Sequence, residues 1–495
     1  MGYYFDRFNN DMRKINSGLR RYSDLLIEQS LQVWNIKSRV GLFFLSLAIS
    51  LGATFFLTPT VFSDAQQYTL FILIFAICLW VTEAIPPFAV GILIMGFLVY
   101  TMGKVEGATL SPNEISNTWS DSVIWIFLGG FFLSEGMRKT YLDISIFRGT
   151  INVFGTKPDY MLLGVMLVTS LLSLIISNTA TSAMILAAVT PFLKKEGKDS
   201  PLSKALLISI PVSATFAGMG SMISSPPNLI VVEALKSKGY IVTFFDWLIL
   251  GFPVGLVLLI LFWLILRKIY TSKVDKVNLD FLKKQPPLPP EIRVQRLVVI
   301  ITLVVTVVMW LMGHSLHIPT AFAAMIPIVF LPMLGVITAE DIRKLPWDTL
   351  MLVAGGLALG LAIKELLAPY YSTLLEGIPF LAIPTMIIFG LITVLCSNFM
   401  SSTATATIVV NIAAVVLPVE LLLPTALIIG LCSSCGLFLP VSTPPNAIVF
   451  STGMLKQKDF FLGGSFGAVV GTLVILLWVL FLKYCTGFFE AIDFL

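Results

Sequence analysis

One set of short motifs occurs twice in this chain, in the same order. The first copy reads Gly129-Gly130, Ser177-Asn178-Thr179 and Pro226-Pro227-Asn228; the second reads Gly355-Gly356, Ser401-Ser402-Thr403 and Pro444-Pro445-Asn446. In each copy the polar cluster interrupts an apolar stretch. An internal repeat with polar breaks at matching positions is typical of membrane carriers whose binding site lies where the two halves meet. The repeat therefore predicts a membrane protein with a transport function.

The composition places the chain in the membrane. Apolar residues make up 57% and charged residues 12%, with a mean hydropathy of +0.93, values that exclude a soluble domain. Apolar runs long enough to cross or nearly cross a bilayer lie at 40–57, 68–82, 88–101, 123–137, 245–266, 297–313, 319–336, 350–363 and 462–482. A polar leader, 1–39, precedes the first run, so we expect a span there and no cleaved signal peptide.

Charge predicts the orientation of the chain. Lysine and arginine concentrate in the leader and in the segment 267–296, so the positive-inside rule places both in the cytoplasm. The leader carries apolar residues between its charges, which fits either a helix on the membrane surface or a passive solvated anchor. The segment 267–296 contains Pro286-Pro287-Leu288-Pro289-Pro290, a stiff spacer between the halves.

The two copies align beyond these motifs. Trp80 pairs with Trp310 and Asp246 with Asp459, so each copy holds five crossings, 68–266 and 297–482. An odd number of crossings forces the second copy to enter from the opposite face. We therefore predict an all-α polytopic membrane protein: two inverted five-span repeats and one extra N-terminal span, about 11 transmembrane helices, with two re-entrant hairpins and two broken helices.

The hairpins are predicted from the charges at their ends. The stretch 160–193 has lysine on both sides, so both ends face the cytoplasm; 379–418 has glutamate on both sides and no nearby lysine, so both ends face outside. The flanking residues are Lys157, Lys194, Lys195 and Lys198 for the first stretch, and Glu376 and Glu420 for the second. Two hairpins entering from opposite faces bring their polar tips together at mid-membrane.

The residue types at the tips indicate their chemistry. Serine, asparagine and threonine are favoured helix N-caps, and the apolar runs 183–189 and 407–416 follow the clusters as helices that begin inside the bilayer. Such helix starts present unpaired N–H groups and a positive dipole end, which suit an anion with a charge at each end. The breaks 217–228 and 436–446 contain no lysine or arginine and supply carbonyl and amide oxygens, which suit a dehydrated cation such as sodium.

Other interpretations remain for these residues. Small polar side chains in membrane helices commonly serve packing, and a proline pair commonly makes a kink; recurrence of the ordered set in both halves favours a site. Glu83, the chief acidic residue in a hydrophobic span, has either a functional or an interfacial role. We expect no enzyme, because the two histidines, His314 and His317, lie in a loop and no carboxylates pair within the spans. An anion channel is the alternative of a different class.

Six segments resemble the divalent anion/sodium symporter family, the INDY-type dicarboxylate transporters. They are WVTEAIPPFAVGILI (80–94), FLGGFFLSEGM (127–137), ISNTATSAMIL (176–186), SSPPNLIV (224–231), STATATIVV (402–410) and PVSTPPNAIVF (440–450). The resemblance covers essentially everything from residue 40 onward. It implies a homodimer in the cell inner or plasma membrane that moves C4-type dicarboxylates such as succinate, malate and fumarate, with sodium as the coupling ion.

The resemblance also implies a division of the chain and a set of site residues. A scaffold (40–122 and 297–345) holds the interface, and a transport domain (123–266 and 346–495) moves as an elevator; 1–39 and 267–296 are the leader and the cytoplasmic linker. Substrate contacts fall to Ser177, Asn178, Thr179, Ser401, Ser402 and Thr403, with Pro227 and Pro445. The first sodium site would use Ser173, Ser177, Asn178, Gly218 and Gly220, and the second Ser397, Ser401, Ser402 and Gly436.

The chain departs from the family pattern at two positions. Ser402 stands where the second tip usually has asparagine, and Ser224 where glycine is common. Serine still donates to a carboxylate and coordinates a cation, but it has no amide. A sodium-independent dicarboxylate exchanger, and a carrier of citrate or sulfate, therefore stay open beside the symporter.

Overall fold

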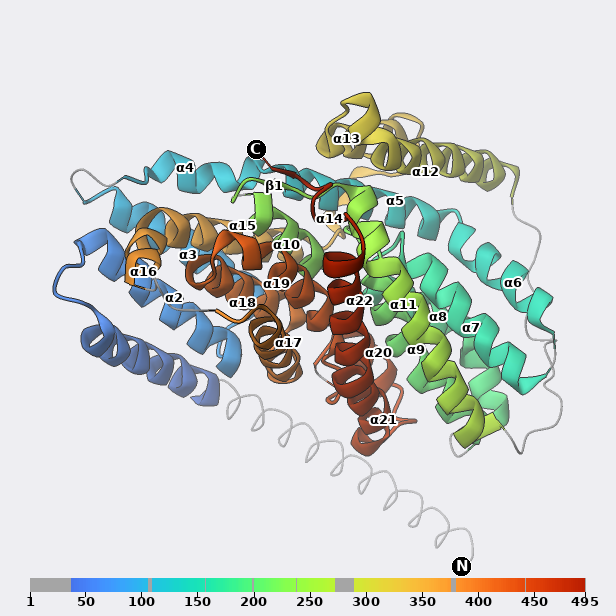
Figure 1. Cartoon of the computed structure of the whole chain (residues 1–495). Coiled ribbons are helices and arrows are strands. Elements are labelled where there is room, and N and C mark those ends of the chain that lie inside the picture. The colour runs from blue at the N-terminus through green and yellow to red at the C-terminus, as the bar shows by residue number, and fades with distance from the viewer. Residues whose placement is uncertain are drawn as a thin grey trace, which may run out of the picture.

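The computed structural model describes residues 37–105, 109–155, 157–197, 200–236, 238–271, 289–374, 380–440 and 442–494 (Figure 1). The leader up to residue 36, Lys198, Glu376 and most of the proline-rich spacer lie outside the described residues. Eight of the described helices are long and apolar enough to cross a membrane, which confirms the all-α polytopic class.

A helix spanning Lys37–Leu57 precedes the first half. That half contains α2 (Asp64–Thr82), α3 (Pro87–Met102), α4 (Pro112–Ser116), η1 (Asn117–Ser120), α5 (Ser122–Lys139), α6 (Leu142–Phe154), α7 (Pro158–Ser173), α8 (Asn178–Glu196), α9 (Pro201–Gly218), α10 (Pro226–Lys236), α11 (Phe244–Leu266) and η2 (Arg267–Thr271).

The second half contains α12 (Pro290–Leu316), α13 (Thr320–Met333), α14 (Ala339–Arg343), α15 (Trp347–Ala362), η4 (Ile363–Leu367), α16 (Ala368–Leu374), α17 (Ala382–Phe399), α18 (Ser402–Val416), α19 (Val419–Cys432), η5 (Ser433–Cys435), α20 (Pro444–Phe450), η6 (Gln457–Asp459), α21 (Phe460–Ser465), η7 (Phe466–Gly471) and α22 (Thr472–Cys485). Two short strands, β1 (Tyr240–Ile241) and β2 (Asp493–Phe494), pair antiparallel beside the helices.

The tryptophans aligned from the sequence make the same contact in both halves. Trp80 Nε1 donates to the carbonyl of Pro87, the first residue of α3, at 3.5 Å, and Trp310 Nε1 donates to that of Thr320, the first residue of α13, at 3.2 Å. Both indoles are buried. Each tryptophan thus ties the end of one helix to the start of the next, because a buried indole N–H needs an acceptor.

The aligned aspartates also have matching roles. Asp246 Oδ2 accepts from Thr243 N at 2.8 Å at the start of α11, and Asp459 Oδ2 accepts from Lys456 N at 2.6 Å at the start of η6. Each carboxylate occupies the third position of a capping box, where it satisfies an otherwise unpaired N–H.

The halves are joined by exchanged helix pairs. α3 of the first half packs on α15 of the second, and α13 of the second packs on α5 of the first. Glycines make both crossings close: a Cβ on Gly355 would collide with the backbone of Gly91, and one on Gly129 would lie 2.5 Å from Ala324 O. Backbones approach this closely only where side chains are absent or very small.

Two local details differ from the sequence expectations, and a third, Glu83, fits one of its two predicted roles. α12 begins at Pro290, so helix occupies the end of the segment 267–296. α12 continues to Leu316, so His314 lies in its last turn; a short loop holds only His317, which is exposed with φ 54°. Glu83 is exposed and ends α2 in the left-handed conformation, which fits the interfacial alternative.

Candidate functional site

The two polar clusters cap helices, as the sequence predicts. Ser177 Oγ accepts from Ala180 N at 3.3 Å at the start of α8, and Ser401 Oγ accepts from Ala404 N at 3.2 Å at the start of α18. Thr179 is exposed, and the other five cluster residues are half-buried. The polar side chains therefore lie at two helix N-termini, and each of them is at least partly exposed.

The tips and the breaks interlock between the halves. α10, which follows the first break, packs against α18, and α20, which follows the second break, packs against α8 (Figure 1). Pro227 and Pro445 lie in the first turns of α10 and α20, and both are buried. The exchange places each proline-proline-asparagine motif against the hairpin of the other half.

The first predicted cation set comes together at the α7–α8 turn. Ser173 Oγ lies 2.6 Å from Asn178 Oδ1 and 2.8 Å from Ala214 O. The Asn178 amide occupies the space where a Cβ on Gly218 would be, so only glycine fits there. Gly220 packs near the same turn, since its Cβ would meet Leu174 Cδ2 at 3.0 Å.

The first break is fixed by its own polar side chains. The Gly218 carbonyl accepts from Ser224 Oγ at 2.6 Å and from Asn228 Nδ2 at 2.8 Å, and the Ser221 carbonyl accepts from the same Nδ2 at 2.7 Å. Ser224, one of the two departures, thus closes the turn. Asn228 Oδ1 is buried and has no partner among the described residues.

The second break has a similar arrangement. Asn446 Nδ2 donates to Leu437 O at 3.2 Å and to Leu439 O at 3.0 Å, and its Oδ1 is buried without a partner among the described residues. A Cβ on Gly436 would lie 2.6 Å from Ser397 Cβ, so these two predicted ligands are also in contact. Ser397 Oγ, too, is buried without a partner in the described part of the chain.

Sequence reasoning missed Asn398. Its Oδ1 accepts from Phe438 N in the second break at 3.0 Å, and its Nδ2 donates to Val394 O at 2.7 Å. The available signal was its place directly after Ser397 and four residues before Ser402. Asn398 links the second hairpin to the second break.

These oxygens form a donor set that fits sodium. Hydroxyl, carbonyl and amide oxygens lie beside each tip, and the orphaned ones, Asn228 Oδ1, Asn446 Oδ1 and Ser397 Oγ, are buried. A buried acceptor without a donor costs about 1–3 kcal/mol, a penalty that a bound cation removes. Sodium takes such oxygen ligands where the backbone of a membrane helix unwinds.

The chain matches a known family along nearly its whole length. A family model described as the sodium:sulfate symporter transmembrane region matches residues 37–487. The chain belongs to this family, the divalent anion/sodium symporters. It is therefore an integral membrane protein of a transporter family.

Curated relatives agree with this assignment, and a solved structure shares the fold. The chain is 30% identical to the sodium-dependent dicarboxylate transporter SdcS of Staphylococcus saprophyticus, over 95% of this chain and 97% of that protein. It is 28% identical to SdcS of Staphylococcus aureus (strain USA300), over 88% and 90%. The YdaH transporter of Alcanivorax borkumensis shares the fold, with a TM-score of 0.55 and 12% identity over 81% of this chain and 98% of that one.

Proposed function

We propose that this protein is a sodium-coupled symporter of C4-type dicarboxylates such as succinate, malate and fumarate. The observation that carries the proposal is the matched pair of tips, in which α8 and α18 each begin at a serine N-cap with half-buried polar side chains. The SdcS relatives are sodium-dependent dicarboxylate transporters by name, which supports both the substrate class and the ion.

Anion binding rests on helix starts and hydroxyls. The N–H groups of the first turns of α8 and α18, with the side chains of Thr179 and Thr403, donate to one carboxylate at each tip. Neither the tips nor the breaks contain lysine or arginine. A dianion therefore lacks a fixed positive partner, and sodium ions beside the tips supply the missing charge.

This charge balance explains the coupling. Ser173, Asn178 and the Gly218 turn would hold one sodium ion, and Ser397 and the Gly436 turn the other. Each ion lowers the free energy of the bound dianion, and by linkage the dianion raises the affinity for each ion. Carboxylate and sodium are then moved together.

Movement of the site is proposed to follow an elevator mechanism in a homodimer. The helix crossings α3–α15 and α5–α13 join the segments assigned to scaffold and transport domain. Glycines at these crossings leave few interdigitating side chains, which suits one body sliding past another. We place the protein in the plasma membrane with its N-terminus in the cytoplasm.

Topology is tested by labelling single cysteines in a background without the five native ones. Lys195→Cys, after α8, is expected to react from the cytoplasm, and Glu420→Cys, at the start of α19, from outside. Reaction of both from one face would show that the repeat is parallel or that the hairpin assignment is wrong.

The exchanger is the second candidate, because Ser402 lacks the amide expected at the second tip. Proteoliposomes preloaded with succinate, malate, citrate or sulfate distinguish the two. A symporter takes up labelled succinate into empty vesicles under a sodium gradient, whereas an exchanger needs a preloaded anion. Saturable counterflow would exclude a channel.

A further inference from the structure

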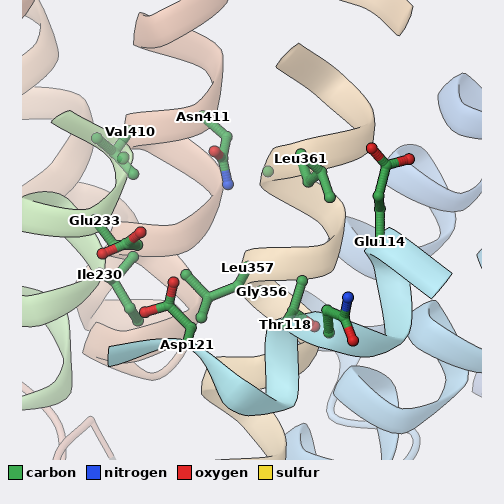
Figure 2. A pocket seen from close by; sticks show the side chains of 13 residues that line it. Glu114, Thr118, Asp121, Ile230, Glu233, Gly356, Leu357, Leu361, Val410 and Asn411 are labelled. Atoms are coloured by element: carbon green, nitrogen blue, oxygen red, sulfur yellow. The ribbon is translucent and has the colours of Figure 1, made fainter. Parts of the chain in front are cut away.

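A cavity of about 250 Å³ lies between the start of α5, α10, α15 and α18 (Figure 2). On α18 it is lined by Val410 and Asn411, nine residues beyond Ser402, or roughly 13 Å along the helix. On α10 it is lined by Ile230 and Glu233. Among the described residues, no residue of either tip, and none of α7, α8 or α17, lines the cavity, so it is separate from the two tips.

The charges in this cavity do not balance. Glu233 and Asp121 point toward each other in Figure 2, and one ammonium serves both: Lys236 Nζ lies 3.1 Å from Glu233 Oε1 and 3.9 Å from Asp121 Oδ2. Glu114, on α4, adds a third carboxylate at the exposed rim. The lining residues from α15 and α18 carry no charge. Close carboxylates repel one another. With Lys236 shared between them, Glu233 and Asp121 keep one uncompensated negative charge among the described residues.

Asn411 is an independent polar group in the cavity. Its side chain is buried at 8% exposure, and the one hydrogen bond that it makes among the described residues runs from Nδ2 to Thr407 O at 2.8 Å. Its Oδ1 therefore has no donor in the described part of the chain. A Cβ on Gly360 would lie 2.8 Å from this Oδ1, so the glycine leaves room for the oxygen.

The repeat itself does not require these polar groups. From the proline-proline-asparagine motifs, Glu233 matches Ser451; from the helix caps, Asn411 matches Ala187. From the glycine pairs, Asp121 matches Trp347. Helix packing thus proceeds in the second copy without the carboxylates, and in the first copy without the amide. The cavity is an added feature of one side of the molecule.

We propose that this cavity binds one monovalent cation, through the Asp121 and Glu233 carboxylates and the Asn411 amide oxygen. The proposal rests on the proposed cation-coupled function and adds a cation position apart from the tips. The ligand carries a single positive charge that neutralises the remaining negative charge of the two carboxylates. Sodium and a proton both supply such a charge.

The test uses the purified full-length protein without substrate. Thermal unfolding midpoints are measured while NaCl replaces choline chloride at constant ionic strength, below and above neutral pH. The variants are Glu233→Gln and Asn411→Ala, the latter being the residue found at the matched position. Glu420→Gln, at an exposed glutamate in the first turn of α19, is the matched control. Glu233→Ser replaces Glu233→Gln if the latter does not fold.

A sodium site is supported if the sodium concentration for half-maximal stabilisation rises at least threefold in Glu233→Gln and Asn411→Ala, but not in Glu420→Gln. A proton site is supported if the sodium response is unchanged and the pH dependence of the midpoint weakens in both Glu233→Gln and Asn411→Ala, but not in Glu420→Gln. The proposal is overturned if both variants match the wild type in sodium and pH response.

Repeating the titration in a background of Asn178→Ala with Ser397→Ala separates this proposal from the function at the tips. The tip variants are expected to lose sodium-driven uptake and to keep the Glu233-dependent response. Loss of that response in the tip background would contradict a separate site.

Discussion

The two tips share a serine cap but carry their amide at different places. The first has Leu174 and, four residues later, Asn178; the second has Asn398 and, four residues later, Ser402. Asn178 accepts from Ser173 within its own hairpin, whereas Asn398 accepts from Phe438 N in the neighbouring break. The same chemical group thus belongs to the tip in one half and to the break in the other.

Because of this difference, we expect the two tips to contribute differently to substrate and sodium binding. At the first tip the amide lies among the groups predicted to contact substrate and sodium. At the second tip the Asn398 amide holds the break after Gly436 by accepting from Phe438 N. Ser402 stands where the first tip has the Asn178 amide. We therefore expect the first tip to dominate uptake, and the second to be more sensitive in sodium affinity.

The largest expected effect is at the first tip. Asn178→Ala and Thr179→Ala should each lower succinate uptake at least a hundredfold in proteoliposomes, because they remove predicted ligands and little core volume. Thr373→Ala, an exposed threonine on α16, is the control and should transport normally. Uptake at the wild-type rate in both folded tip variants would refute the site.

Removal of the Asn398 amide should mainly lower the stability of the protein. Asn398→Ala leaves Phe438 N without its acceptor, so the free energy of unfolding should fall by about 1–3 kcal/mol, and the sodium concentration for half-maximal uptake should rise. Thermal unfolding and sodium titration measure the two effects. Asn398→Leu, which copies Leu174, should behave alike; an unchanged sodium response in both would separate Asn398 from the cation site.

Placing asparagine at the second tip should make its sodium binding more like that of the first tip. Ser402→Asn adds an amide oxygen, and a gain of about 1 kcal/mol in coupled cation binding would lower the half-maximal sodium concentration roughly fivefold. Sodium titration of succinate uptake measures this shift. An inactive Ser402→Asn would show that the serine belongs to a different anion site, and sulfate and citrate should then be tested.

The smallest effect concerns the ion pair between Lys139, at the end of α5, and Asp341, on the short helix α14. Burial raises the pKa of Asp341, but hydrogen bonds from Lys139 and Thr338 outweigh it and lower the pKa to about 2. Its stabilisation is present above the unfolded pKa near 3.9 and is lost as pH falls through about 2. Lys139→Met should lower the unfolding midpoint at neutral pH and less in acid; a pH-independent loss would indicate packing alone.

The sequence predicted the helical class and the caps well, because apolar length and N-cap chemistry are local properties. The alignment of the halves paired Trp80 with Trp310, and the structure gives both indoles the same contact. Asn398 and the Asp121–Glu233 pair were missed because their partners lie far away along the chain. Such contacts depend on how α10, α17 and α18 pack, which no local pattern specifies.

The central claim is that both tips bind one dicarboxylate together with sodium. Labelled succinate uptake into proteoliposomes, with and without an inward sodium gradient, tests it most directly when wild type and Asn178→Ala are compared. We expect gradient-dependent accumulation by the wild type and none by the variant. Equal wild-type uptake in both conditions, appearing only with preloaded anion, would contradict the account and leave the exchanger in its place.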